Sequence, residues 1–256
     1  MKEGLSTQQK EADKDLNILA LFTLLPLMGF LAFQEPIINF SRSPDHSLWI
    51  RLIVLALCQF SVAGLGTSAV LIRRKESIQK YGLVKKKFFP TILQTVLIAL
   101  PLLIFLIASG QVHSYLPFQS ILLTKEVLSS PFPTNFVGYL LISLIWGFWE
   151  GFNYVVIAQK INLRYPQYVK GVWNLGAFVC ALICLLIHGM IGFDSLSLLQ
   201  EGTVFILIYG MLLVQRRTGN AWGCILIFIF LWNAFNILKI MTTRQTGGLY
   251  QGYKPR

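Results

Sequence analysis

The chain has 256 residues, of which 55% are hydrophobic and 13% are charged, and its formal net charge is +11 at pH 7. A soluble domain carries about 25% charged residues, so this composition excludes an ordinary soluble globular protein. Apolar stretches close to the ~20 residues of a membrane-crossing helix recur along the chain, and the alternating pattern of a membrane β-barrel is missing from the sequence. We therefore expect an all-α integral membrane protein that contacts the lipid bilayer. We attribute its basic residues to loops and headgroup contacts rather than to nucleic-acid binding.

Seven spans are predicted, so the expected fold is a polytopic transmembrane helical bundle of about seven to eight spans. The predicted spans cover residues 16–33, 52–72, 88–109, 136–161, 171–193, 203–215 and 220–240. An eighth span, or a broken helix merged into one of the seven, would move the C-terminal tail to the other side of the membrane. The connection 110–135 has apolar residues at helical spacing, and it either lies flat at the interface or dips into the bundle.

The chain is interpreted as a single membrane domain over residues 1–256, with polar tails at 1–15 and 241–256. The most basic segment is the connection between the second and third spans, which holds Arg73, Arg74, Lys75, Lys80, Lys85, Lys86 and Lys87. Cytoplasmic loops of membrane proteins are enriched in lysine and arginine. The pattern therefore predicts a multi-pass protein of the cell membrane with a cytoplasmic N-terminus.

The late spans carry polar side chains inside their apolar runs. These are Glu150, Asn153 and Tyr154 in the fourth span, His188 in the fifth, and Asn233 and Asn236 in the seventh. Helical spacing places the polar residues of the fourth span on one side of their helix, and likewise those of the seventh span. A Glu150 side chain that faced lipid would cost about 2.5–3.5 kcal/mol. We therefore predict that they converge on one site inside the bundle. The alternative is that they only hold helices together, at about 0.6 kcal/mol per hydrogen bond.

Metal and redox chemistry are not expected. The four cysteines lie inside apolar runs and form no CxxC pair; they are Cys58, Cys180, Cys184 and Cys224. One glutamate and one histidine fall short of the three protein ligands that a catalytic zinc normally takes. The sequence therefore predicts no cofactor and no metal, and we interpret the cysteines as small buried side chains.

Four motifs follow one another in the second half of the chain. They are EGFNYVV from Glu150, CLLIH ending at His188, YGMLLVQRRTGNAWGCI from Tyr209, and CILIFIFLWNAFN ending at Asn236. In order and separation they resemble the motifs of the CPBP family, the CAAX-protease and bacteriocin-processing membrane proteins, also called Abi proteins. The resemblance covers about residues 136–236, and we assign a CPBP-like core to residues 136–240.

The motifs depart from the family pattern at several positions. The family's glutamate pair, followed three residues later by arginine, is reduced here to Glu150, with Gly151 and Val155 at the other two positions. Cys184 replaces a phenylalanine four residues before His188. In the last motif, Asn233 matches the family's asparagine, and the position of its histidine falls on Ile229 or, with a one-residue offset, on Phe228.

The resemblance implies the site of a glutamate-dependent intramembrane protease. Glu150 and His188 would activate a water, and Asn233 would remain from the pair that stabilises the oxyanion. Asn153, Tyr154, Cys184 and Asn236 would line the pocket or support these groups. Loss of one oxyanion donor typically costs 10²–10³ in rate.

We therefore predict a protease-like fold with a degenerate site and a non-catalytic binding, regulatory or immunity role. Its ligand would be a membrane-embedded or lipidated peptide or a partner membrane protein. Two alternatives stay open. One is an active, divergent peptidase that uses Glu150 and His188, and the other is a small transporter or permease partner with Glu150 as a proton or ion site.

Overall fold

The computed structural model describes residues 5–110, 112–188 and 192–237, and within these ranges the chain is mostly helical. Four helical segments there are long and apolar enough to cross a membrane: α1 (Thr7–Ala32), α5 (Phe88–Ala108), the continuous segment Thr134–Arg164 and α10 (Ser195–Thr218). α3 (Leu48–Ala63) and α4 (Leu65–Arg74) make a fifth such segment if they are counted as one span bent by 57°. Two further helical segments are apolar but shorter: α9 (Leu175–Ile187) and Trp222–Trp232.

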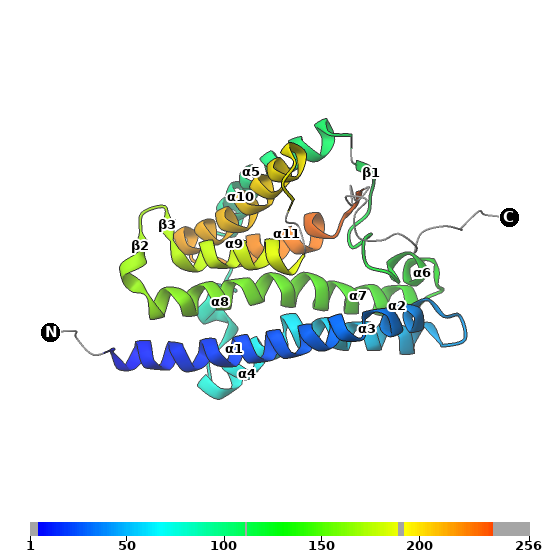
Figure 1. Cartoon of the computed structure of the whole chain (residues 1–256), viewed down its shortest axis with the longest axis horizontal. Coiled ribbons are helices and arrows are strands. Elements are labelled where there is room, and N and C mark those ends of the chain that lie inside the picture. Colours follow the sequence, from blue (N-terminus) through cyan, green and yellow to red (C-terminus); the bar gives the residue numbers. More distant parts are fainter. Residues whose placement is uncertain (1–4, 111, 189–191, 238–256) are drawn as a thin grey trace.

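α8 (Glu150–Arg164) is the central helix of the bundle (Figure 1). α1 and α4 pack against one side of it, α9 and α11 (Trp222–Ile227) pack against the other, and α10 and α5 lie beyond α9. Ten of the 15 residues of α8 are buried, whereas only 11% of the most apolar stretch of α1 is buried. An apolar helix that faces outward in this way is suited to contact with lipid.

Two π-helical segments interrupt the helices that pack together at the centre. η2 (Ser143–Trp149) joins α7 (Thr134–Ile142) to α8, and η4 (Phe228–Trp232) extends α11. η2 and η4 pack against each other. Helical segments of this kind are rare and often occur at functional sites. Here each one ends directly before a polar residue of the predicted site.

The break between α3 and α4 is centred on Gly64. An added Cβ at this position would lie 2.3 Å from Cδ2 of Phe60, so the phenylalanine ring occupies the space that a side chain would need. The apolar run predicts one span over residues 52–72. In the structure this run forms α3 and α4, which meet at a 57° bend and are compatible with one bent span.

Helix capping extends two helices beyond their predicted bounds. Ser6 and Gln9 form a capping box, in which Ser6 Oγ accepts from the Gln9 amide and Gln9 Oε1 accepts from the Ser6 amide. α1 therefore starts at Thr7, and the predicted polar tail over residues 1–15 is helical from that residue on. Asp194 caps α10 through backbone amides of its first turn, so this helix is longer than the predicted 203–215. The predicted tail 241–256 lies outside the described residues.

Short strands replace the ends of two predicted spans. β1 (Val112–Tyr115) pairs antiparallel with β4 (Phe235–Ile237), so the seventh helical segment ends at Trp232 instead of continuing to residue 240. β2 (Val169–Lys170) and β3 (Trp173–Asn174) form a hairpin, and Asn174 then caps α9 through the Ala177 amide. The fifth helix therefore starts at Leu175 rather than at residue 171. Residues 189–191 and 238–240 lie outside the described ranges.

The remaining elements cover the ends of the bundle. α2 (Gln34–Arg42) follows α1, and α6 (Thr124–Ser129) is the only α-helix in the described part of the connection 110–135. Arg51 of α3 forms an ion pair with Glu126 of α6, which holds this connection against α3. Two 3₁₀ turns lie at the other end: η1 (Ile78–Tyr81) and η3 (Pro166–Tyr168). We call that end the basic end, because the N-termini of α1 and α5 and the C-termini of α4, α8 and α10 meet there with most of the lysines and arginines.

A buried ion-pair network ties α8 to its neighbours at the basic end. Lys160 Nζ lies 2.9 Å from Asp15 Oδ2 of α1 and 3.0 Å from Glu76 Oε2 of the α4–α5 connection. The Lys160 and Asp15 side chains are 4% and 2% exposed. Arg74 Nε at the end of α4 donates to Asp15 Oδ1 over 2.8 Å. The network therefore joins four chain segments through one lysine and one aspartate.

Glu76 remains ionised in this network. Burial by itself would raise the pKa of this carboxyl group, but hydrogen bonds from Lys80, Tyr81 and Lys160 outweigh burial and lower the pKa to about 2. Glu76 therefore presents a negative charge to Lys160 at any physiological pH.

We expect Lys160→Ala to destabilise the protein by about 3–5 kcal/mol, because it leaves Asp15 and Glu76 buried without their shared cation. Thermal unfolding of the purified protein in detergent measures the loss. Lys80→Ala is the matched control: Lys80 also pairs with Glu76, but its side chain is 56% exposed and its removal should cost about 0.5 kcal/mol or less. Equal losses in the two variants would show that the buried network does not stabilise the fold.

Candidate functional site

Glu150 and His188 lie next to each other, with Glu150 buried in the bundle and His188 at its edge. Glu150 starts α8 and is 6% exposed, and His188 caps the C-terminus of α9. His188 Nε2 is 3.8 Å from Glu150 Oε1, a distance that allows an ion pair when the imidazole is protonated but exceeds a normal hydrogen bond. The His188 side chain is 34% exposed, so this pair reaches the edge of the bundle.

The second carboxylate oxygen of Glu150 is bound by Gln59, a residue outside the predicted site. Gln59 Nε2 of α3 donates to Glu150 Oε2 over 3.1 Å. One helical turn further along α8, Asn153 Oδ1 accepts from Thr67 Oγ1 of α4 over 2.6 Å. Gln59 and Thr67 both lie inside the second predicted span, so a polar residue within an apolar run is the signal that could have found them. The predicted site drew on the later spans alone and therefore missed both.

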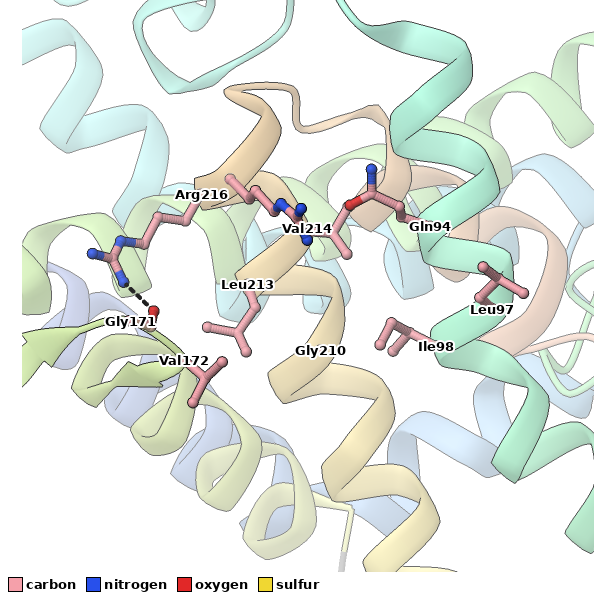
Figure 2. Close-up of a pocket in the computed structure, with 10 residues that line it drawn as sticks. Gln94, Leu97, Ile98, Gly171, Val172, Gly210, Leu213, Val214 and Arg216 are labelled. Atoms are coloured by element: carbon pink, nitrogen blue, oxygen red, sulfur yellow. Dashed lines mark hydrogen bonds between the residues drawn. The ribbon is translucent and has the colours of Figure 1, made fainter.

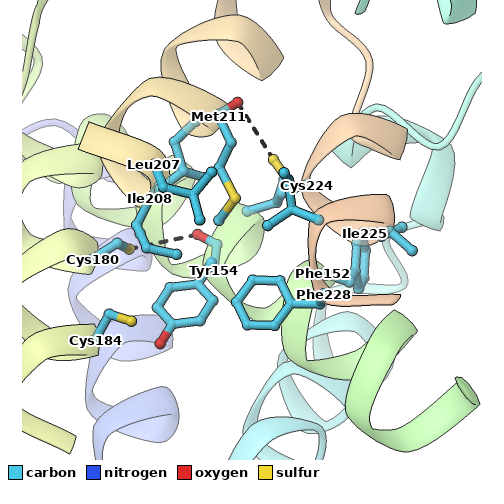
Figure 3. Packing of buried hydrophobic residues seen from close by; sticks show 14 of the residues in the cluster. Phe152, Tyr154, Cys180, Cys184, Leu207, Ile208, Met211, Cys224, Ile225 and Phe228 are labelled. Carbon is cyan, nitrogen blue, oxygen red and sulfur yellow. Dashed lines mark hydrogen bonds between the residues drawn. The ribbon is translucent and has the colours of Figure 1, made fainter. Parts of the chain in front are cut away.

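Tyr154 and Cys184 belong to the apolar core between α8, α9 and α11. The Tyr154 ring stacks on Phe228 with the ring centroids 5.4 Å apart, and its side chain points toward Cys184 (Figure 3). Cys180 Sγ lies 3.6 Å from the backbone oxygen of Tyr154. Cys184 is fully buried in this cluster. These contacts explain both residues as packing groups, and a role in the pocket remains a prediction.

Asn233 directs its polar atoms to a different segment. Its side-chain Oδ1 accepts from Ser120 Oγ over 3.0 Å, and its backbone oxygen accepts from the Ser120 amide over 3.1 Å. The preceding residue, Trp232, contacts His188 with ring centroids 5.1 Å apart. Asn233 thus follows a residue that touches the histidine, but it fastens the connection between β1 and α6. Asn236 lies in β4, and its side chain is outside the described part of the structure.

The positions where the chain departs from the CPBP motifs are filled by close packing. An added Cβ on Gly151 would lie 2.9 Å from both the Cys224 oxygen and the Ile225 Cα, so α11 crosses α8 at this glycine. Val155 is fully buried. A side chain at position 151 would displace α11, and a charged side chain at position 155 would be buried.

The two candidate positions for the missing histidine are also packed. Ile229 fills the space over Gly147, where an added Cβ would lie 2.4 Å from Ile229 Cγ1. Phe228 is fully buried and holds the ring of Tyr154. Ile229 and Phe228 therefore supply packing at these two positions rather than proton donors or acceptors.

The arrangement supports proton exchange or hydrogen bonding. A carboxyl group with an imidazole 3.8 Å away can hold or pass a proton. In the part of the chain that the structure describes, no group of three or more histidine, cysteine, aspartate or glutamate side chains is arranged to hold a metal ion. The groups that contact the pair include the side-chain amide of Gln59 and the ring of Trp232.

Comparison of the chain with protein-family models, with curated proteins and with solved structures finds no match. The resemblance to the CPBP family therefore depends on the motifs alone.

We expect Gly151→Ala to destabilise the protein by about 1–3 kcal/mol, because the new methyl group overpacks the crossing of α8 and α11. Gly202→Ala is the matched control, since Gly202 also lies inside a helix but an added Cβ there meets nothing within 4 Å. That control should be neutral or stabilising by up to about 1 kcal/mol. Detergent-solubilised thermal unfolding compares the two, and a Gly151 variant as stable as the control would contradict the close crossing.

Proposed function

We propose that this protein is a multi-pass membrane protein with a CPBP-like core that binds, rather than cleaves, a hydrophobic peptide or partner. The observation that carries the proposal is the contrast around Glu150. Its pairing with His188 is retained, while the positions of the other motif residues are closed by packing. Glu150 and His188 would recognise a polar group, and the protein would act as a binding, regulatory or immunity factor.

The first argument against peptidase activity concerns the oxyanion. Peptide hydrolysis needs donors at the position where the carbonyl oxygen becomes charged, and losing one donor costs 10²–10³ in rate. Ile229 and Phe228, at the position of the family's histidine, cannot donate a hydrogen bond. The Asn233 Oδ1 accepts from Ser120, while its side-chain Nδ2 is buried without a hydrogen-bond partner among the described residues. This side of the site therefore keeps one of the two oxyanion donors of the family motif.

The second argument concerns the orientation of Glu150. In the family motif, neighbouring charges would position the catalytic glutamate, whereas here Gly151 and Val155 occupy those places. Gln59 now holds one carboxylate oxygen of Glu150 from α3. A general base has to reach the proton that it abstracts, and small misplacements reduce the rate strongly. The hydrogen bond from Gln59 fixes the carboxylate for recognition without supplying a catalytic partner.

The ligand follows from the surroundings of the pair. The His188 side chain is one-third exposed, while Glu150 is buried behind it. A polar group that approaches along an apolar surface would meet the imidazole first. A membrane-embedded peptide, a lipidated peptide tail or the transmembrane helix of a partner offers such a combination of apolar surface and isolated polar groups.

An active, divergent peptidase is the second candidate, and the 3.8 Å separation of Glu150 and His188 is the observation that favours it. In that case the pair would activate a water, and another donor would have to stabilise the oxyanion.

We expect the reconstituted protein to leave prenylated and leader peptides intact and to retain them in photo-crosslinking. Glu150→Gln and His188→Ala should reduce crosslinking about tenfold, by removing a charge-assisted contact. Ser61→Ala, on α3 and without a contact to the pair, is the control and should crosslink like the wild type. Cleavage that disappears in both Glu150→Gln and His188→Ala would establish the peptidase alternative and overturn the binding proposal.

We further propose seven spans, with the basic end in the cytoplasm. The seven helical segments run alternately away from and toward the basic end, beginning with α1 and finishing with Trp222–Trp232. α9 and the segment Trp222–Trp232 are shorter than a full membrane span. If they cross the membrane, the bilayer has to be thinner around them. The concentration of lysine and arginine at one end supports a cytoplasmic N-terminus.

Reporter fusions test this topology. Alkaline phosphatase inserted after Asp45 or Ser130 should be active, because both connections lie at the end opposite the basic end. Insertion after Lys86 should give an inactive enzyme and a fluorescent green fluorescent protein fusion. The reverse pattern would overturn the orientation, and equal phosphatase activity at all three positions would exclude the alternation of spans.

A further inference from the structure

A groove separate from the Glu150 site opens between α5 and α10 near the basic end. It has a volume of about 590 Å³ and is bounded on one side by the β2–β3 turn (Figure 2). Leu97 and Ile98 of α5 face Leu213 of α10 across it (Figure 2). Arg216 and Arg217, at the C-terminal end of α10, also line it. Basic side chains and an apolar floor are therefore combined in one groove.

The floor of the groove is accessible. Leu97 is 55% exposed and Val172 of the β2–β3 turn is 80% exposed. Ile98 packs over Gly210, where an added Cβ would lie 2.4 Å from Ile98 Cγ2. Seven residues separate Gly210 from Arg217, which is about 10 Å along a helix. The apolar floor thus extends well below the arginines, toward the middle of α10.

The two arginines differ from the ion-paired basic residues at this end. Arg74, Lys160 and Arg164 each form ion pairs with acidic side chains of α1 or the α4–α5 connection. Among the described residues, neither Arg216 nor Arg217 pairs with a carboxylate. Arg216 donates one hydrogen bond, from Nη1 to the Gly171 oxygen over 3.2 Å, which holds its guanidinium beside the groove. Two positive charges therefore remain available in the lining of the groove.

We propose that this groove binds one anionic phospholipid. The phosphodiester group lies at Arg216 and Arg217, and the first part of an acyl chain lies over Leu97, Ile98 and Leu213. Basic pockets between membrane helices bind anionic headgroups in this manner, and guanidinium groups match phosphate oxygens in charge and geometry. A zwitterionic lipid would bring its own cation next to the arginines. This inference does not depend on the function proposed for Glu150.

Native mass spectrometry of the full-length protein in detergent tests the site, with phosphatidylglycerol and phosphatidylcholine of identical acyl chains as probes. The wild type should bind one phosphatidylglycerol about tenfold or more tightly than phosphatidylcholine, and Arg216→Gln/Arg217→Gln should abolish this preference. The matched control is Lys14→Gln/Arg73→Gln, which removes two charges at the same end, from α1 and α4, that also lack a carboxylate partner in the described structure. It should keep the preference within about twofold.

Two further measurements keep the proposal open to refutation if the double arginine variant fails to fold. Leu97→Trp, an exposed change that fills the groove, should weaken binding of phosphatidylglycerol at least fivefold. Free glycerol phosphate should not compete at the lipid's binding concentrations, because it lacks the acyl chain. The proposed site would be overturned if the arginine variant kept its preference for phosphatidylglycerol, or if the matched control lost it equally. It would also be overturned if Leu97→Trp bound phosphatidylglycerol as the wild type does, or if glycerol phosphate competed.

Discussion

The burial of the Glu150 carboxyl group is the constraint on which the arrangement of the bundle depends. A carboxyl group on an apolar helix is costly unless it is paired or hydrogen-bonded. Its partners come from two different helices: Gln59 from α3 and His188 from α9. These contacts bring α3, which packs against η2, and α9, which packs against α8, to the same carboxyl group. The layered order of the bundle follows, with α8 at the centre and the more exposed α1 and α5 outside it.

The sequence predicts the position of each helical segment but not how each one ends. α5 is predicted within one residue at each end, because an apolar run of suitable length is bounded by Lys87 and Ser109. The end of the last segment at Trp232 depends on pairing between β4 and β1, whose residues are more than a hundred positions away. Such a contact leaves no periodic pattern. The proximity of Glu150 and His188 could be predicted because both are polar residues in apolar runs, and Gln59 could have been found by the same rule.

The departures from the CPBP motifs form one connected set. Gly151 accommodates the backbone of α11, and the same helix carries Phe228 and Ile229 into the space around Tyr154 and Gly147. A charged residue at position 151 would push α11 away, and a histidine in η4 would disturb these contacts. A single substitution toward the motif would therefore meet a packing barrier, and accommodating it would need coordinated changes at the neighbouring positions.

The bend at Gly64 is held by hydrogen bonds to a single neighbouring helix. Gln59 lies before the bend and binds Glu150, while Thr67 lies after it and binds Asn153. The angle between α3 and α4 is consequently set by two side chains that are three residues apart on α8. A ligand that drew the Glu150 carboxylate away from Gln59 would remove the hydrogen bond on the α3 side of the bend and leave the Thr67–Asn153 hydrogen bond on the α4 side in place.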